Sequence, residues 1–173
     1  EVVGNGVDFA AFDPTGIAPQ PELAATPGPH FVFTGQMDYP PNVAAVERFA
    51  RSIRPRMRQT QRAAQFHIVG RAPTAAVRAL DIETGVRVWG EVAAVQPFLA
   101  AADIVVAPLT IARGIQNKVL EAMAMARPVL LTPDAATGIG AEDGVHFAVE
   151  AGAAGFVARD RRGEVKEIEI AVA

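Results

Sequence analysis

Short apolar runs alternate along this chain with longer stretches in which apolar residues recur at helical spacing. Each run has the length of a buried strand, and turn-forming residues follow most of them. We predict five strands, over residues 31–34, 66–69, 86–89, 104–107 and 129–131. Each of the first three is followed directly by a glycine.

The stretches between these strands predict helices. One begins at Asn42 or Val43, after two prolines, and is interrupted or ended by Pro55. Two more cover residues 73–80, with Thr74 as the cap, and 92–102, with a proline in the first turns or at a kink. The regular alternation indicates an α/β fold, a Rossmann-like parallel sheet flanked by helices on both faces.

The two ends of the chain lack this regularity. Residues 1–29 are rich in turn residues, and we interpret them as an extended interdomain linker or lead-in. The Rossmann-like domain is expected over residues 30–158, with one or two short edge strands at 146–149 and 155–158. Residues 159–173 form a charged tail without a predicted structure. Because the chain opens on Glu and not on Met, we expect a domain of a longer protein.

Composition narrows the function. The net charge of -3 and the pI near 5.6 give no reason to expect nucleic acid or an anionic membrane as partner. Cysteine is absent, so disulfides and thiolate metal sites are excluded. The chain shows no signal peptide and no apolar run of about 18 residues. We expect a cytoplasmic location, at the inner face of the membrane if a missing portion holds an anchor.

Several common site motifs are also missing from the sequence. It contains no G-x-G-x-x-G after a strand, no P-loop and no G-x-S-x-G elbow, so a Rossmann-type NAD site, a P-loop ATPase and an α/β-hydrolase site are not expected. No His, Asp and Glu residues have metal-ligand spacing, and no metal or other cofactor is predicted.

The most informative stretch is 114–128, which lies between the fourth and fifth strands. A glycine marks the point where loop meets helix, and such a junction directs backbone N–H groups and the positive helix end at one spot, which suits a phosphate. Lys118 and Glu121 are three apart and share a helix face near that end. The opposite, core-facing stripe is expected to consist of Ile115, Val119, Ala122, Met123 and Ala126.

Glycines at strand ends point to the same edge of the sheet. Gly35, Gly70 and Gly90 each close a strand, where a parallel sheet binds its ligands and where glycine lets a ligand approach the backbone. Any one of them is explained by turn chemistry alone. The three together with Gly114 favour a nucleotide-sized ligand. Residues 137–140 are a second candidate N–H loop or a mobile one.

Two further features have a structural interpretation that outweighs the functional one. His67 lies inside a strand, and a packed or hydrogen-bonded histidine is favoured over a catalytic one. Arginines gather between positions 48 and 62, and a solvated helix face is favoured over a polyanion or lipid site.

The stretch Arg113-Gly114-Ile115-Gln116-Asn117-Lys118-Val119-Leu120-Glu121-Ala122-Met123-Ala124 resembles the motif E-G-F-G-x-x-x-x-E-A-M-A of retaining glycosyltransferases of the GT-B fold, family 4 (group 1). The similarity runs from Val3 to about Ala158 and includes Asn5-Gly6-Val7-Asp8, which looks like the family's interdomain linker. The variants at 35–42 and 114–118 look like the branch of exopolysaccharide-type sugar transferases.

The resemblance implies a role for each matching position. Glu121 would accept hydrogen bonds from the ribose of the donor, a UDP- or GDP-sugar. The N–H groups of Gly114 and Ile115 would hold the diphosphate, which Lys118 could neutralise as the glycosidic bond breaks. Gly35 would belong to the site, and the loop Gly90-Glu91-Val92 would lie along the base. Family members generally need no bound metal.

Two positions depart from the family pattern. The first glutamate of the motif, which faces the sugar, is Arg113 here. Two alternatives follow: Arg113 pairs with a phosphate or a sugar carboxylate, or this branch organises the donor differently. The usual basic residues of the first strand–helix loop are also missing, since residues 36–42 contain none. Diphosphate binding would therefore rely on Lys118, Arg113 and backbone N–H groups.

Three functions stay open on the sequence. The leading hypothesis is the donor-binding half of a glycosyltransferase that moves a sugar to a glycan or lipid-linked acceptor and needs its N-terminal GT-B domain for turnover. The second is a non-catalytic, nucleotide-binding or regulatory module, which Arg113 favours. The third is a nucleotide-sugar epimerase of similar architecture, against which the spacing of Lys118 and Glu121 argues.

Overall fold

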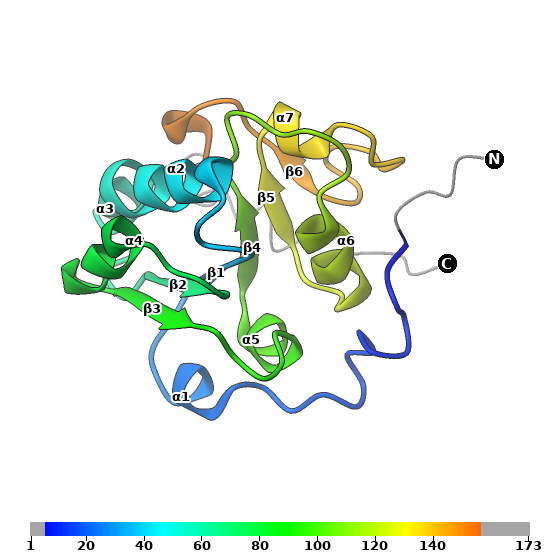
Figure 1. Ribbon diagram of the computed structural model, residues 1–173, viewed down its shortest axis with the longest axis horizontal. Coiled ribbons are helices and arrows are strands. Elements are labelled where there is room, and N and C mark those ends of the chain that lie inside the picture. The colour runs from blue at the N-terminus through cyan, green and yellow to red at the C-terminus, as the bar shows by residue number, and fades with distance from the viewer. Residues whose placement is uncertain (1–5, 157–173) are drawn as a thin grey trace.

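The fold is built on a six-stranded parallel sheet (Figure 1). The computed structural model describes residues 6–156. The strand order is β3-β2-β1-β4-β5-β6, and every pair is parallel. The strands are β1 His30–Thr34, β2 Gln65–Val69, β3 Val86–Gly90, β4 Ile104–Ala107, β5 Val129–Leu131 and β6 Ala148–Val149.

Helices lie against both faces of the sheet. On one side are the helices that connect β1 to β2 and β2 to β3, and on the other are those that connect β3 to β4 and β4 to β5 (Figure 1). The first group is α2 Pro40–Arg48, a π-helical segment Phe49–Ile53, α3 Arg54–Met57, α4 Ala75–Arg78 and a 3-10 turn Ala79–Ile82. The second group is α5 Gln96–Ala101 and α6 Asn117–Ala124. Two further helices are α1 Pro21–Ala24, which precedes β1, and α7 Pro133–Ala136, which connects β5 to β6.

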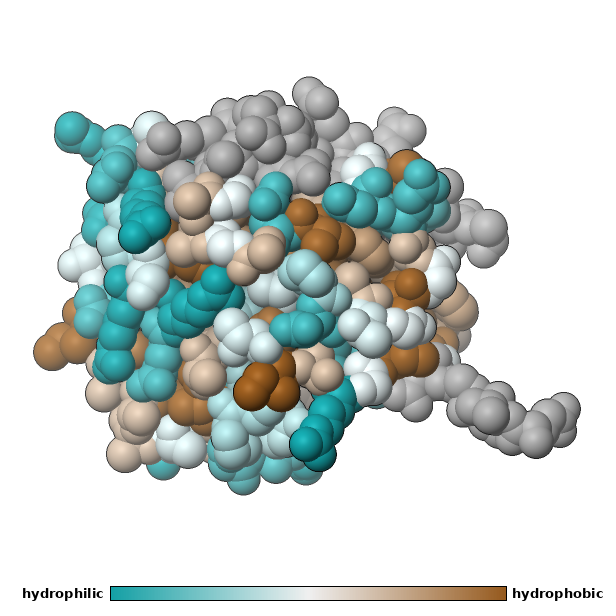
Figure 2. All heavy atoms as spheres, turned by 90° about the horizontal axis from the view of Figure 1, so that it is seen from above, coloured by the Kyte–Doolittle hydropathy of each residue, from teal (hydrophilic) through white to brown (hydrophobic). Residues whose placement is uncertain are grey.

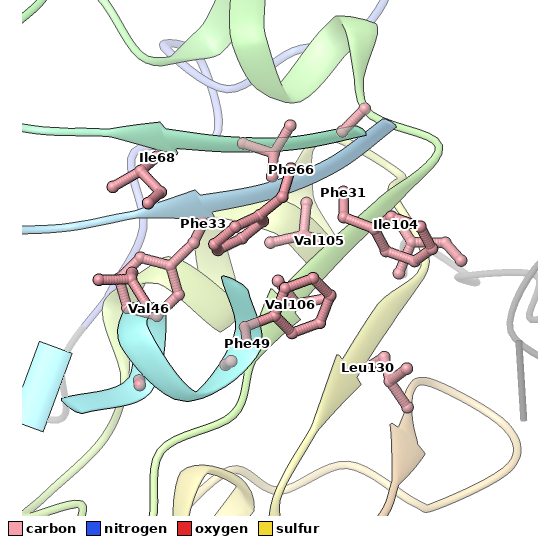
Figure 3. Close-up of a cluster of buried hydrophobic side chains, with 14 of the residues drawn as sticks. Phe31, Phe33, Val46, Phe49, Phe66, Ile68, Ile104, Val105, Val106 and Leu130 are labelled. Carbon is pink, nitrogen blue, oxygen red and sulfur yellow. The ribbon is translucent and has the colours of Figure 1, made fainter. Parts of the chain in front are cut away.

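The core occupies both faces of the sheet, and an aromatic cluster within it lies between the central strands and the α2–α3 layer. Phe49 is fully buried, and its ring centroid lies 4.4 Å from that of Phe66 and 5.7 Å from that of Phe31. Figure 3 shows these rings pointing at one another from the helical layer and from two adjacent strands. Both faces of β1, β2 and β4 are buried, which explains why these strands read as continuous apolar runs and not as alternating ones.

Pro55 interrupts the first helical layer, the one that connects β1 to β2, as expected. A proline has no N–H to donate to the carbonyl four residues earlier, and the turn directly before it, Phe49–Ile53, widens to π geometry. The chain then resumes as α3. The widened turn is the one that carries Phe49 into the core.

The expected fold class is confirmed, with three local differences. The lead-in is not wholly extended, because Pro21 and the side chain of Gln20 start the short helix α1, whose Leu23 is buried. The helix expected over 92–102 begins only at Gln96, which places Pro97 in its first turn. At the far edge, β6 is a strand as expected, but residues 153–156 are helical. The tail 159–173 lies outside the described residues.

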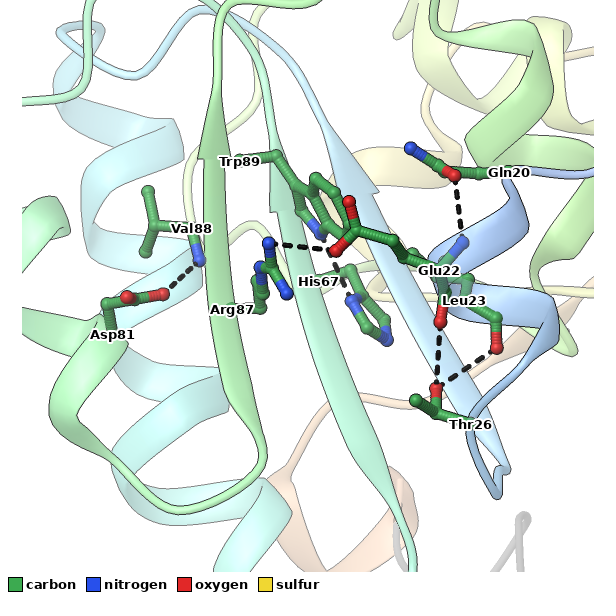
Figure 4. A network of polar contacts seen from close by, with 9 residues as sticks. All are labelled: Gln20, Glu22, Leu23, Thr26, His67, Asp81, Arg87, Val88 and Trp89. Atoms are coloured by element: carbon green, nitrogen blue, oxygen red, sulfur yellow. Dashed lines mark hydrogen bonds and ion pairs between the residues drawn. The ribbon is translucent and has the colours of Figure 1, made fainter.

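His67 is a packed sheet histidine, as favoured from the sequence. Its Nδ1 accepts a hydrogen bond from the indole Nε1 of Trp89 at 3.2 Å, and its Nε2 lies 3.1 Å from Nδ1 of His30. Figure 4 shows His67 and Trp89 beside α1, whose Glu22 pairs with Arg87 of β3 at 3.0 Å. Burial, together with the nearby His30 and Arg87, lowers the pKa of His67 to about 3, so the ring is neutral at pH 7.

On the face seen in Figure 2, hydrophobic residues of the described part of the chain occur in small groups among hydrophilic ones. Large hydrophobic side chains that are exposed, among them Phe9, Ile82 and Ile111, lie far apart in the sequence. Within residues 6–156, none of the helices combines the length and apolarity that crossing a bilayer requires.

Candidate functional site

A cleft of about 620 Å³ opens at the carboxyl ends of β1, β2 and β3 and reaches the start of α6. Its position follows from the topology. The chain leaves β1 toward β2 on one side and leaves β4 toward β5 on the other, so the connections diverge between these two neighbouring strands. Open parallel sheets bind ligands at such a switch point. The lining residues are Thr34, Gly35, Gln36, Tyr39, Asn42, Gly70, Arg71, Glu91, Val92, Val95, Ile115, Gln116, Asn117, Lys118 and Glu121.

Lys118 lies in the first turn of α6 and reaches the floor of the cleft. Its side chain is buried, with 9% exposed, and its Nζ donates to Oδ1 of Asn42 at 2.7 Å. The same Nζ lies 4.3 Å from the ring centroid of Phe33, a cation–π contact. Burial lowers the pKa of Lys118 from 10.5 to about 8, while the carboxylate of Glu121 acts in the opposite direction. Lys118 is therefore mostly charged at pH 7 and is partly desolvated before any ligand arrives.

Glu121 lies one turn further along the same face of α6. It is half-buried and lines the cleft together with Lys118. Burial raises its pKa, and Lys118 partly offsets that rise. A carboxylate in this setting is an acceptor for two hydroxyl groups of a ligand.

The two helices that begin at the cleft differ in what they offer an anion. α2 starts with Pro40 and Pro41, which have no N–H, and the N–H groups of Asn42 and Val43 both donate to the carbonyl of Tyr39. α6 starts without proline, so Asn117 and Lys118 both carry a backbone N–H, while that of Val119 donates to the carbonyl of Gln116. An anion in the cleft is thus directed toward α6 and Lys118.

Two glycines, Gly35 and Gly70, allow close packing of the backbone and side chains at the floor of the cleft. A Cβ on Gly70 would collide with the carbonyl oxygen of Gly35, so the ends of β1 and β2 can meet only without a side chain there. A Cβ on Gly35 would lie 2.9 Å from Nδ2 of Asn42 and 3.2 Å from Nζ of Lys118. Both residues also have positive φ, +154° at Gly35 and +152° at Gly70, which disfavours other residues.

Most of the site residues expected from the sequence lie together. Gly35, Glu91, Val92, Ile115, Lys118 and Glu121 all line the cleft. Three others are not among the lining residues: Gly90, which ends β3 with φ +71°, and Arg113 and Gly114, which are exposed in the loop before α6. The helix begins at Asn117, later than the expected junction at Gly114, because Gly114 turns the chain with φ +69°. The functional roles assigned to these residues stay predictions.

Sequence reasoning did not assign Asn42, Arg71, Tyr39 or Gln116 to the site. Arg71 follows Gly70, already marked as a strand-ending glycine, so its position at the carboxyl edge was the available signal. From the sequence, Asn42 was interpreted only as the start of a helix, because nothing in the sequence reveals its contact with Lys118, 76 residues away. Within residues 6–156, no three His, Asp or Glu side chains come close enough to hold a metal ion.

Solved structures that superimpose on this chain include several glycosyltransferases. A glycosyltransferase from Rickettsia africae ESF-5 superimposes with a TM-score of 0.73 at 15% identity, over 97% of this chain and 49% of that one. WaaG, a glycosyltransferase involved in lipopolysaccharide biosynthesis, gives 0.72 at 16% identity, over 96% and 48%. Anabaena Alr3699/HepE in complex with UDP-glucose gives 0.69 at 16% identity, over 96% and 49%. The chain thus spans about half the length of these proteins.

Comparison with curated protein sequences finds no match. The family model for glycosyl transferases group 1, in contrast, matches residues 28–166, which include every residue that lines the cleft. The chain therefore belongs to the group 1 glycosyltransferases, and its parallel sheet is that of the Rossmann-like C-terminal domain of their GT-B fold.

Proposed function

We propose that this chain is the donor-binding domain of a retaining glycosyltransferase, which moves a sugar from a nucleotide-sugar to a glycan or lipid-linked acceptor. The acceptor site would be supplied by an N-terminal GT-B domain, and turnover would require both domains. The exopolysaccharide-type branch is the proposed setting, on the strength of the sequence variants at 35–42 and 114–118.

One observation carries the proposal: Lys118 and Glu121 emerge from the first turns of α6 into a single cleft at the switch point of the sheet. A cation and a carboxylate one turn apart match the two polar parts of a nucleoside diphosphate. The diphosphate needs positive charge, and the ribose needs a hydroxyl acceptor. Among the structures with this fold, HepE is described in complex with UDP-glucose, which supports a nucleotide-sugar as ligand.

The cleft orients such a ligand along the strand ends. The diphosphate would lie at the start of α6, beside Lys118, because α2 offers it no backbone donor. Glu121 would accept hydrogen bonds from the ribose. The base would extend along Glu91 and Val92 at the end of β3, where the cleft is bounded by Val95.

Lys118 would then act on the leaving group. When the bond between the sugar and the diphosphate breaks, negative charge builds up on the phosphate oxygens that leave. A lysine already desolvated and held in place stabilises that charge with little reorganisation. The N–H groups at the start of α6 add a fixed positive field in the same direction.

Calorimetric titration of the 173-residue chain with UDP and with GDP, each with and without Mg²⁺, tests the proposal. We expect saturable binding of one of them, independent of Mg²⁺, and the same experiment identifies the base. Failure of both nucleotides to bind at millimolar concentration, with the fold verified by circular dichroism, would contradict a donor site formed by this domain.

A second function is favoured by one specific observation. Arg113 stands where the family motif has the glutamate that faces the sugar, and its side chain is exposed outside the cleft lining. A domain that binds nucleotide without transferring sugar would have this appearance. Nucleotide binding without transfer by the full-length protein, restored by Arg113→Glu, would favour the non-catalytic module.

A further inference from the structure

Loop 36–42, the name used here for the residues after β1 together with the first turn of α2 up to Asn42, carries no cation. It nevertheless contacts both cationic side chains that line the cleft in the described chain. These are Lys118, from α6, and Arg71, which directly follows β2. The loop therefore sits between two positive charges that come from other elements of the fold.

Asn42 holds the first of these cations. Its Oδ1 accepts from Nζ of Lys118 at 2.7 Å, and its Nδ2 donates to the backbone carbonyl of Gln36 at 2.9 Å. With both ends of the amide engaged, the oxygen must face the lysine. Asn42 is buried, with 6% exposed, so water competes little for this contact.

The surroundings leave the Lys118 ammonium little freedom. The absence of a side chain at Gly35 provides the room in which Asn42 and Lys118 meet, and the Phe33 ring lies on another side of Nζ. A lysine side chain has four rotatable bonds, and fixing it in advance removes an entropy cost from ligand binding.

Gln36 holds the second cation. Its Oε1 accepts from Nη2 of Arg71 at 2.8 Å, while its own carbonyl holds Asn42. A backbone hydrogen bond of 2.8 Å from Met37 N–H to the Arg71 carbonyl keeps the two loops together. Gln36 and Arg71 are exposed, so this contact is weaker than the buried one between Asn42 and Lys118.

We propose that loop 36–42 is a positioning loop, in which Asn42 directs Lys118 and Gln36 directs Arg71 toward the diphosphate of the bound donor. This inference rests on the proposed function, because it assigns both cations to the donor's phosphates. It explains how a loop without basic residues still serves the phosphate site. It also assigns the second positive charge of that site to Arg71, because Arg113 lies outside the cleft lining.

The first test needs no ligand. The sequence has only two lysines, Lys118 and Lys166, so the side-chain ammonium signals can be followed by NMR as pH is raised, with Lys118→Met providing the assignment. Asn42→Ala should lower the pKa of Lys118, because the ammonium loses its acceptor, and Asn42→Asp should raise it. Lys166 serves as the internal reference. An unchanged Lys118 titration in both variants would overturn the role of Asn42.

The second test separates phosphate binding from base binding. Calorimetry compares UDP with uridine, or GDP with guanosine if GDP is the nucleotide that binds. Asn42→Ala should weaken nucleoside diphosphate binding about tenfold, as expected for loss of one hydrogen bond to a charged group, and leave nucleoside binding within about twofold. Gln36→Ala should act in the same direction with a smaller effect. Arg78→Ala, an exposed arginine on α4, is the matched control for Arg71→Ala.

Double variants decide whether each pair acts as a unit. Asn42→Ala should add little to Lys118→Met, and Gln36→Ala should add little to Arg71→Ala. Additive losses, or equal losses for nucleoside and nucleoside diphosphate, would overturn the positioning loop while leaving the donor site intact. A wild-type chain that binds neither UDP nor GDP would overturn the proposed function and this assignment together.

Discussion

The Nε2 atom of His67 lies 3.1 Å from Nδ1 of His30, and the proton between them belongs to His67. Trp89 can only donate, so Nδ1 of His67 is an acceptor and its proton must sit on Nε2. His30 then accepts at Nδ1 and donates from Nε2 to the Thr26 carbonyl, 3.0 Å away. The chain of hydrogen bonds runs in one direction, from β3 through β2 and β1 to the segment after α1.

Acid should disrupt this chain. The pKa of His67 is about 3 in the fold, against 6.5 for an unperturbed histidine, so the unfolded chain takes up a proton first. The stabilising contribution is complete above pH 6.5 and is lost as pH falls toward 3, at about 1.4 kcal/mol per pH unit. Urea unfolding of the wild type and His67→Gln between about pH 7 and 4.5 should show a smaller loss in the variant. His146→Gln, the control, should follow the wild type.

Gly70→Ala should strongly destabilise the chain. The new methyl group would collide with the Gly35 carbonyl, which is backbone and cannot swing away, at a φ that alanine disfavours. We expect a loss of at least about 3 kcal/mol in the free energy of unfolding. Gly140→Ala, where nothing lies within 4 Å of the added carbon, should stay within about 0.5 kcal/mol. Equal stability of the two variants would show that the strand ends can separate.

Glu121→Ala should weaken donor binding without unfolding the domain. Loss of hydrogen bonds between a charged acceptor and the ribose corresponds to about 1.5–3 kcal/mol in binding free energy. Calorimetric titration with the nucleotide measures this. The wild type should bind the 2′-deoxynucleotide more weakly than the nucleotide, whereas the variant should bind the two with equal affinity. Glu142→Ala, an exposed carboxylate outside the cleft, is the matched control.

Nucleotide affinity should fall as pH rises past 8. Lys118 has a pKa of about 8, so it loses its charge over the following pH units, whereas the nucleotide's phosphates are fully ionised well below that range. Bound diphosphate favours the charged lysine, which moves the midpoint in the complex above 8. Calorimetry from about pH 7 to 9.5 should show the decline in the wild type, and Lys118→Met should bind weakly with a flat profile. A flat wild-type profile would remove Lys118 from the phosphate contacts.

Phe49→Ala should test the core contact made by the π-helical turn. Its ring is fully buried against Phe66 and Phe31, and truncation should cost about 3–5 kcal/mol in the free energy of unfolding. Phe9→Ala, whose side chain is 65% exposed, should cost less than about 0.5 kcal/mol. Chemical denaturation of both variants provides the comparison.

Periodicity was enough to predict the five long strands and the helical connections, because the central strands are buried on both faces and so stand out as apolar runs. The first helical layer was predictable up to Pro55, but the π geometry before it was not, since it depends on how Phe49 packs against β1 and β2. Thr74 caps α4 as predicted, because a cap acts through residues adjacent in sequence.

In the candidate site, too, the features set by residues close in sequence were predictable, and those set by long-range contacts were not. The relative position of Lys118 and Glu121 was predictable, because a separation of three residues on one helix places two side chains on the same face. Asn42 and Arg71 were not, since their contacts depend on strands and loops brought together by the sheet. Arg113 shows the opposite case: it lies inside the recognisable motif, yet the turn at Gly114 leaves it outside the cleft.

The central place of β1 has a consequence for motion. β1 is hydrogen-bonded on both sides, to β2 and β4, and all five of its residues are buried, so its amides should exchange with solvent only when the whole domain opens. The loops at the strand ends are less protected, since Gln36 and Tyr39 in one and Arg71 in another are exposed. The site therefore joins a fully buried strand to partly exposed loops, and a bound nucleotide should slow amide exchange in the loops while leaving β1 as slow as before.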